Sequence, residues 1–339
     1  MHAPVLGFVL VFIAAIAGGG LAVPLKKRRQ FELENIYIPS TLVMMIVLPF
    51  IMAALVTPQW MDAIRMAGAR TVWAGVAYGF GWGAGSILFG YGVTMAGMSV
   101  GFATIMGINT AVGSMLPFLV KSPADLFTRG GLVILCGIAG CVLGVAICGR
   151  AGSLRERHAG ASGGRRGFGA ALLVCAASGI LASCANLGFA FTSRVGDQAL
   201  ELGAKPVFAT LASWLPVFWG ATAPLLLWFG ALQIKRGTWR KNFGPEAAHD
   251  WTMGVLMGVI WFLATIPYGM GAYYLGRLGT SVGWAVNIAS SLLVANVFGF
   301  LTHEWTGAPV RILRTLYSGL AILIAAIVLL AVGSAMIAS

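Results

Sequence analysis

Ten long apolar runs constrain what this chain can fold into more than any other feature of its sequence. A helix needs about 20 apolar residues to cross a bilayer core of ~30 Å, and each run reaches that length. The runs cover residues 4–25, 37–57, 71–95, 98–120, 129–149, 168–193, 206–233, 252–275, 280–302 and 312–337. The pattern predicts an all-α membrane protein with ten transmembrane helices. The first run has no Lys or Arg before it and a basic cluster after it, so we expect a span rather than a cleavable signal peptide.

A short phrase occurs twice and indicates an internal duplication. Gly97–Phe102 (GMSVGF) recurs as Gly279–Trp284 (GTSVGW), 182 positions later, each time at the junction of two apolar runs. Five runs precede the longest polar connection and five follow it, and an odd number of spans per half forces the second half to insert upside down. We therefore expect two inverted five-helix repeats, residues 1–150 and 168–339, joined by a flexible cytoplasmic linker, residues 151–167.

Glycine is placed where helices could approach one another closely. Both copies of the phrase contain a Gly-xxx-Gly pair, which would let the spans at 98–120 and 280–302 lie close to their neighbours. The run at 71–95 holds seven glycines. Two interpretations stay open for this run: tight packing alone, or a helix that bends or moves beside a site.

The basic residues indicate topology rather than nucleic-acid binding. The net charge is +12, but only 9% of residues are charged and 59% are apolar. Lys and Arg number 15 in the odd-numbered connections and 7 in the even-numbered connections and termini. By the positive-inside rule, this asymmetry predicts that both termini lie on the non-cytoplasmic side of the inner membrane. Basic side chains would then contact anionic membrane lipids.

Ionisable side chains are missing from the middle of the spans. All ten acidic residues and all four histidines fall in connections or at span ends, which disfavours a membrane-embedded enzyme and a buried metal site. The five cysteines lie in the fifth and sixth runs without a CxxC pair or a histidine partner, so we expect packing residues. They are Cys136, Cys141, Cys148, Cys175 and Cys184. The sequence predicts no cofactor and no metal.

Neutral polar and aromatic residues do occur at mid-depth, some of them at helical spacing on one face. The candidate substrate-binding residues are Tyr78, Trp82, Ser86, Asn109, Asn186, Trp214, Trp261, Thr265, Tyr268 and Asn287. Aromatic faces cover the C–H surface of a sugar, and amides and hydroxyls pair with its hydroxyls. The set therefore favours an uncharged polyol over a phosphate or a cation. Packing remains the alternative explanation for each residue taken singly.

The chain resembles the L-rhamnose–proton symporter family, a branch of the drug/metabolite transporter superfamily, over nearly its whole length. Two strings carry the resemblance most specifically: Tyr91–Met95 (YGVTM) leading into Gly97-Met98-Ser99, and Arg150–Arg157 (RAGSLRER). Pro24 with Lys26-Lys27, Leu48-Pro49 and Glu304-Trp305 also match. The resemblance implies uptake of a six-carbon deoxy sugar driven by a proton gradient. One departure is the segment Leu278–Trp284, which is small and uncharged here.

Together these features predict a secondary transporter that imports L-rhamnose or a related neutral monosaccharide with protons by alternating access. The site would lie near mid-depth between the halves. A drug or metabolite exporter and an uncoupled sugar facilitator stay open as alternatives, as does the oligomeric state. With no carboxylate or histidine inside the spans, His249, His303 and Glu304 at the span ends are the nearest candidates for proton coupling, since imidazole titrates near neutral pH, although all three could simply mark the membrane interface.

Overall fold

The computed structural model describes residues 3–57, 59–158 and 168–338. Within these residues the chain forms helices and turns without a strand, and ten helical segments are long and apolar enough to cross a membrane. The segments are α1–α2 (Pro4–Gly20 and Ala22–Lys26), α3–η1–α4 (Leu33–Leu42, Val43–Val47 and Leu48–Val56), α6 (Ala69–Ala96), α7 (Met98–Lys121), α8 (Arg129–His158), α9–α10 (Phe168–Phe191 and Ser193–Glu201), α11–η3–α12 (Pro206–Ala209, Thr210–Ser213 and Trp214–Arg236), α13 (Ala247–Tyr274), α14 (Val282–Leu301) and α15 (Val310–Ala338). The prediction of an all-α protein with ten spans is confirmed.

Short helices occupy the connections. They are α5 (Trp60–Ala67), η2 (Pro123–Asp125), η4 (Thr238–Phe243) and η5 (Gly276–Leu278). The expected linker at 151–167 is partly helical, because α8 continues through His158; residues 159–167 lie outside the described part of the chain. The division into two repeats at this linker stays a prediction.

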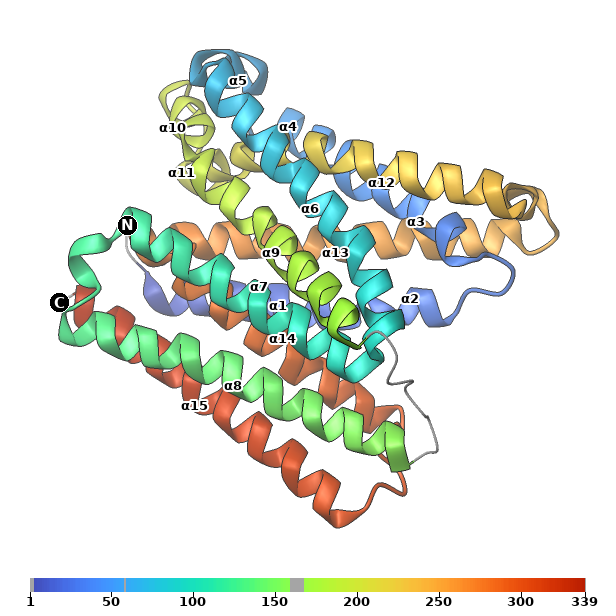
Figure 1. The fold of residues 1–339 in the computed structure, drawn as a ribbon. Coiled ribbons are helices and arrows are strands. Elements are labelled where there is room, and N and C mark those ends of the chain that lie inside the picture. Colours follow the sequence, from blue (N-terminus) through green and yellow to red (C-terminus); the bar gives the residue numbers. More distant parts are fainter. Residues whose placement is uncertain (1–2, 58, 159–167, 339) are drawn as a thin grey trace.

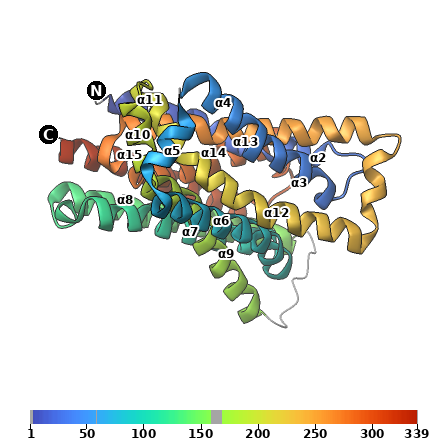
Figure 2. The same ribbon diagram turned by 90° about the horizontal axis from the view of Figure 1, so that it is seen from above.

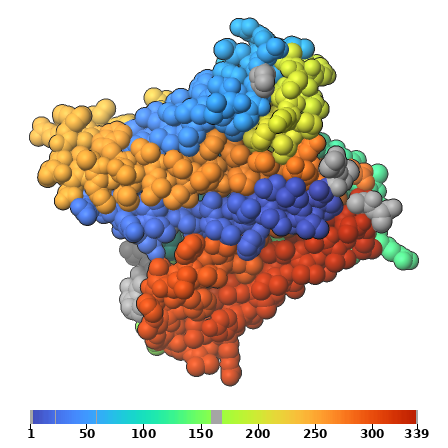
Figure 3. All heavy atoms as spheres, turned by 180° about the vertical axis from the view of Figure 1, so that it is seen from behind, coloured from blue at the N-terminus to red at the C-terminus, as the bar shows by residue number. Residues whose placement is uncertain are grey.

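The spans form a bundle in which helices from the two ends of the sequence interleave. α8 and α15 run side by side along one edge, as the green and red ribbons in Figure 1 show. α6 packs against α9 and α12, and α13 packs against α1 and α3. The blue α1 therefore lies between α13 and α14, which is visible from behind in Figure 3. Figures 1 and 2 both place the N and C termini at the same end of the bundle, as an even number of crossings requires.

The glycines of α6 serve its close contacts with α9 and α12. A Cβ on Gly79 would lie 2.0 Å from the carbonyl oxygen of Val217, and one on Gly220 would lie 2.0 Å from that of Val76. A Cβ on Gly85 would lie 2.7 Å from the backbone nitrogen of Ala182 on α9. Because α6 is one uninterrupted helix, tight packing accounts for these glycines.

The two copies of the repeated phrase differ in local conformation. Gly97 joins α6 to α7 with φ +88°, a left-handed conformation that favours glycine, whereas Gly279 has φ −57°. Gly101 and Gly279 allow close contact with the preceding helix, since a Cβ would lie 2.8 Å from Val93 Cα and 1.9 Å from the Ala272 carbonyl oxygen, respectively. A Cβ on Gly283 would lie 3.4 Å from its nearest neighbour, which is an ordinary contact distance. Only in the first copy does the second glycine of the pair therefore allow the expected close helix contact.

The second span contains a π-helical segment where proline interrupts the hydrogen-bond pattern. Pro49 lacks an N–H, and its ring would collide with the carbonyl of the residue four positions earlier. The segment Val43–Val47 adopts the wider π-helix immediately before it, which accommodates the proline without ending the span.

Candidate functional site

Seven aromatic side chains from five spans meet in the centre of the bundle. We call them the central aromatic cluster: Trp82 (α6), Phe189 (α9), Trp214 and Phe218 (α12), Trp261 and Tyr268 (α13) and Trp284 (α14). Their ring centroids are separated by 5.9 Å for Trp82–Trp261, 6.3 Å for Trp82–Phe218, 5.4 Å for Trp214–Phe218, 4.7 Å for Phe189–Trp214, 6.3 Å for Trp214–Tyr268 and 5.3 Å for Tyr268–Trp284. The cluster unites four predicted site residues in one continuous aromatic path.

Asn186 joins one end of the cluster to three other elements. Its side-chain nitrogen donates to the carbonyl oxygens of Gly113 on α7 (2.8 Å) and Thr280 (2.7 Å), and its side-chain oxygen accepts a hydrogen bond from the Tyr268 hydroxyl. Asn186 is fully buried. With both donors and its acceptor in use, this amide positions the helices around the cluster.

Three other predicted site residues are either hydrogen-bonded within their own helix or lie apart from the cluster. The hydroxyls of Ser86 and Thr265 each donate to the carbonyl one turn earlier, those of Trp82 and Trp261 (both 3.0 Å). Tyr78 packs its ring against Phe191, with a centroid distance of 5.9 Å, and belongs to neither the cluster nor its hydrogen bonds.

Several buried polar atoms on α7, α12 and α14 and in the connection before α14 have no hydrogen-bond partner in the described structure. They are Asn109 Oδ1, Ser114 Oγ, Trp214 Nε1, Thr280 Oγ1 and Asn287 Oδ1. A Cβ on Gly269 would lie only 3.0 Å from the Trp214 indole nitrogen, so glycine keeps space beside that donor. Buried polar groups are normally paired, because an unpaired one costs about 1–3 kcal/mol. These neutral donors and acceptors are therefore suited to an uncharged ligand rich in hydroxyl groups.

A cavity of about 360 Å³ reaches the cluster from one end of the bundle, and we call it the Thr280 cavity. Its lining includes Phe189, which stacks on Trp214, and Thr280, whose hydroxyl is unpaired. Its rim carries Lys121, at the end of α7, and Asp197, on α10. The volume lies in the range of pockets that hold small molecules.

At the opposite end of the bundle, Glu304 binds two cations from distant parts of the chain. We call Lys26, Arg155, Glu304 and Trp305 the Glu304 cluster. Lys26 Nζ lies 2.5 Å from Glu304 Oε1, and Arg155 donates to the Glu304 carbonyl oxygen (3.2 Å) while its guanidinium lies 4.5 Å from the Trp305 ring centroid. The hydrogen bond from Lys26 lowers the pKa of the Glu304 carboxyl below its ordinary value of 4.5, with Arg155 acting in the same direction.

The other two proton-coupling candidates lie far from the aromatic cluster. His303 is exposed beside Glu304, with a left-handed backbone (φ 59°). His249 Nε2 lies 3.1 Å from the Lys27 carbonyl oxygen at the same end of the bundle. Among the described residues, no hydrogen bond or ion pair joins either histidine to a candidate substrate-binding residue.

The cysteines are free thiols. Cys141, Cys148 and Cys175 are buried and Cys184 is partly buried, as expected of packing residues. Cys136 differs from that expectation because it is exposed on the surface of α8. No group of three or more His, Cys, Asp or Glu side chains that could hold a metal occurs among the described residues.

Comparison with known proteins identifies the family. The family model described as L-rhamnose-proton symport protein (RhaT) matches residues 1–337. The chain belongs to this family. It is 25% identical over 341 residues to an L-rhamnose-proton symporter of Klebsiella pneumoniae subsp. pneumoniae, covering 98% of this chain and 99% of the relative. Symporters of Escherichia coli O1:K1 and Cronobacter sakazakii are each 25% identical over 342 residues, with the same coverage.

Membership of the rhamnose-proton symporter family makes this chain a multi-pass membrane transporter and not an enzyme.

The candidate site includes several residues that the sequence analysis did not predict. Phe189 lies three residues after Asn186, and Phe218 lies four after Trp214, so helical spacing from a predicted residue could have found both. Thr280 lies in the second copy of the repeated phrase, which marks the segment by duplication and not by helical spacing, and the folded connection before α14 brings it to the cavity.

Proposed function

We propose that this protein imports L-rhamnose, or a closely related neutral monosaccharide, with protons across the inner membrane. The observation that supports a sugar is the set of unpaired neutral polar atoms on α7, α12 and α14, of which Trp214 Nε1 belongs to the central aromatic cluster. None of the cluster residues is charged, which suits a sugar better than an ionic solute. The names of the family and of its relatives support both rhamnose and proton coupling.

The proposed transport is tested by uptake of radiolabelled L-rhamnose into proteoliposomes with and without an imposed pH gradient. We expect accumulation only when the gradient is imposed. Equal, non-accumulating uptake in both conditions would favour an uncoupled facilitator, and no uptake in either orientation of the gradient would contradict rhamnose transport.

We further propose that the two halves are inverted repeats of the drug/metabolite transporter type. Helix contacts support this arrangement, because the main contacts of the third and fourth spans recur when each span is exchanged for the span five places away. α6 contacts α9 and α12, and its counterpart α13 contacts α1 and α3. α7 contacts α8 and α9, and its counterpart α14 contacts α15 and α1. Two such halves around one site are suited to alternating access.

The proposed orientation places both termini on the non-cytoplasmic side, on the strength of the 15-to-7 distribution of basic residues. We expect an alkaline phosphatase fused after Ser339 to be active and a green fluorescent protein fused there to be dark. A fusion inserted in the connection near Arg155 should show the opposite behaviour. The reverse pattern at the two positions would contradict the orientation.

We infer that in this orientation the protein is open to the outside and closed to the cytoplasm. The Thr280 cavity lies among the even-numbered connections, and the Glu304 cluster lies among odd-numbered ones. Beside the cavity, Arg277 Nη2 lies 3.0 Å from Asp125 Oδ2 and joins the ends of α13 and α7. We propose that breaking the Glu304 cluster accompanies opening toward the cytoplasm.

The unpaired indole N–H of Trp214 gives a selective test of the sugar site. Trp214→Phe keeps a ring that can stack on Phe189 and Phe218 but removes the donor. We expect rhamnose affinity to fall about 5- to 20-fold, as loss of one buried hydrogen bond predicts, with thermal stability unchanged or raised. Isothermal titration on purified protein measures the affinity.

Trp219→Phe is the matched control. Trp219 lies on the same helix and its indole nitrogen is also buried and unpaired, but its ring faces Phe50 and Trp60 instead of the central aromatic cluster. We expect its rhamnose affinity to equal that of the unmodified protein. Equal affinity losses in the two variants would place the Trp214 donor outside the sugar site.

Glu304 is proposed to act in closure of the cytoplasmic end and not as the proton carrier. Its lowered pKa means that its ion pairs are fully present above pH 4.5 and are lost as pH falls through the lowered value. We expect Glu304→Gln to slow uptake by up to about fivefold, the scale of a partly exposed ion pair, while rhamnose still drives proton uptake. A pH-sensitive dye inside proteoliposomes reports the proton signal; its complete loss with sugar binding retained would make Glu304 the carrier.

A further inference from the structure

The loop between α2 and α3 is held in a fixed conformation by a buried carboxylate. Asp250 on α13 is fully buried and accepts backbone hydrogen bonds from Arg29 (2.8 Å), Gln30 (2.6 Å) and Phe31 (2.7 Å). The Gln30 side chain also donates to the carbonyl oxygen of Lys241 (2.6 Å). The basic residues of this loop are therefore presented on a rigid support, which lowers the entropic cost of binding a ligand.

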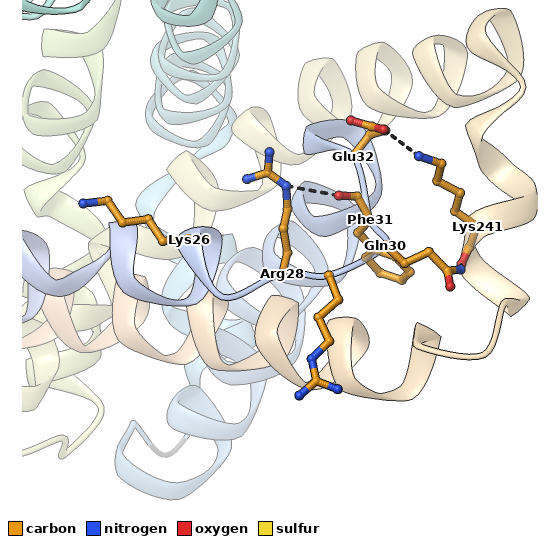
Figure 4. Close-up of a pocket in the computed structure, with 7 residues that line it drawn as sticks. Lys26, Arg28, Gln30, Phe31, Glu32 and Lys241 are labelled. Atoms are coloured by element: carbon orange, nitrogen blue, oxygen red, sulfur yellow. Dashed lines mark hydrogen bonds and ion pairs between the residues drawn. The ribbon is translucent and has the colours of Figure 1, made fainter. Parts of the chain in front are cut away.

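A pocket of about 370 Å³ opens beside this loop, and Figure 4 shows the residues that line it. They are Lys26, Arg28, Arg29, Gln30, Phe31, Glu32 and Lys241. The lining holds four cations and one carboxylate, and Glu304 and Glu246 pair with two of those cations, which leaves a net charge of +1. A preorganised pocket with this charge attracts anions.

Arg28 differs from the other cations of the pocket in its partners. Its guanidinium donates through Nε to the Phe31 carbonyl oxygen (3.1 Å) and through Nη1 to that of Leu25 (2.9 Å). No ion pair joins it to a carboxylate among the described residues. The other three cations are each paired with a glutamate: Lys26 with Glu304, Arg29 with Glu246 and Lys241 with Glu32. The backbone contacts orient the Arg28 guanidinium and leave Nη2 for an external acceptor.

The pocket lies at the ends of spans, where lipid headgroups are found. Next to Lys241, η4 exposes Trp239 (47%) and Phe243 (80%), and the Arg240 guanidinium lies 5.6 Å from the Trp239 ring centroid. Exposed aromatic residues at span ends are typical of the membrane interface, and basic pockets there suit anionic headgroups. A soluble anion would gain nothing from the exposed apolar rings.

We propose that this pocket binds the phosphate diester of an anionic phospholipid headgroup, with Arg28 as the main donor. Arginine is suited to this role because its planar guanidinium can donate two parallel hydrogen bonds to one phosphate. The site is separate from the proposed sugar path, since it shares no residue with the central aromatic cluster or the Thr280 cavity.

The test measures lipid binding to the full-length protein in detergent, by thermal stabilisation and by lipid retention in native mass spectrometry. Phosphatidylglycerol, phosphatidylcholine and soluble glycerol phosphate are the three ligands. We expect phosphatidylglycerol alone to bind at low concentration, with affinity falling as salt is raised. Binding of glycerol phosphate as tight as that of phosphatidylglycerol would overturn the lipid as the occupant.

Arg28→Gln should weaken phosphatidylglycerol binding about tenfold or more. Arg65→Gln is the matched control, because Arg65 is an exposed arginine on α5 at the other end of the bundle, paired with Asp62. It should bind the lipid as the unmodified protein does. If Arg28→Gln is too unstable to purify, Arg28→Lys keeps the charge but not the planar fork and should still weaken binding severalfold. Equal lipid affinity in the Arg28 and Arg65 variants would overturn the proposal.

Discussion

Replacing either Trp82 or Trp261 by alanine is expected to abolish rhamnose binding while the protein remains folded in detergent. The two rings meet edge to face across the bundle, 5.9 Å apart, and connect α6 to α13 at one end of the central aromatic cluster. Removing one ring deletes a surface for the C–H face of a sugar and disrupts the contact with the other. The combined loss should be ~2 kcal/mol or more per site, which is at least about 30-fold in affinity.

Phe80→Ala controls for the loss of an aromatic side chain from the same helix. Phe80 lies two residues before Trp82 but is 55% exposed on the outer surface of α6. Its removal should leave rhamnose affinity unchanged. Gel filtration and thermal melting establish that each variant is folded before binding is measured. Normal rhamnose affinity in both tryptophan variants would mean that these rings only pack and that the sugar binds elsewhere.

Reversing the charge of Glu304 should impair transport strongly without impairing rhamnose binding. In Glu304→Lys, a third cation replaces the carboxylate between Lys26 and Arg155, so attraction becomes repulsion at both contacts. These contacts measure 2.5 Å to Lys26 and 3.9 Å to Arg155, and two charges about 4 Å apart interact by ~1 kcal/mol in water-like surroundings. We expect closure of the cytoplasmic end to become about 10- to 100-fold less favourable and uptake to fall accordingly, with rhamnose binding in detergent retained.

The double variant Lys26→Glu with Glu304→Lys restores one of the two contacts and should recover part of the uptake. Arg65→Glu is the control for charge reversal, because the Arg65–Asp62 pair lies within one short helix at the other end of the bundle. It should transport at the normal rate. Full activity of Glu304→Lys, or no recovery in the double variant, would contradict a role of this ion pair in closure.

The fold could be predicted from the sequence because hydropathy depends on each segment alone. All ten runs became helical spans, since a segment of that length and composition can satisfy its backbone in lipid only as a helix. The residues at which the helices begin and end were less predictable. α8 continues past residue 149 because arginines such as Arg150 and Arg155 favour a helix even after it has left the apolar region. The short amphipathic helices α5 and α10 lay in segments expected only to connect spans.

Residues of the candidate site could be predicted from the sequence only where they lie at helical spacing on one face of a span. Helical spacing selected Trp82, Trp261 and Tyr268, which belong to the central aromatic cluster. The same rule also selected Tyr78, which packs elsewhere, because a membrane helix is apolar on every face and spacing alone does not show which face is inward. Contacts between distant segments had no local signal, as with Glu304 and Lys26, which are 278 positions apart.

The central claim, coupled import of a neutral sugar, is tested most directly by the internal pH of proteoliposomes that contain the unmodified protein. With no gradient imposed and the membrane voltage clamped, L-rhamnose is added outside and an internal pH dye is followed. Coupled import predicts immediate acidification of the lumen that saturates with rhamnose, is absent with L-glucose and is lost in the Trp82→Ala variant. Rhamnose entry without any change of internal pH would contradict the account.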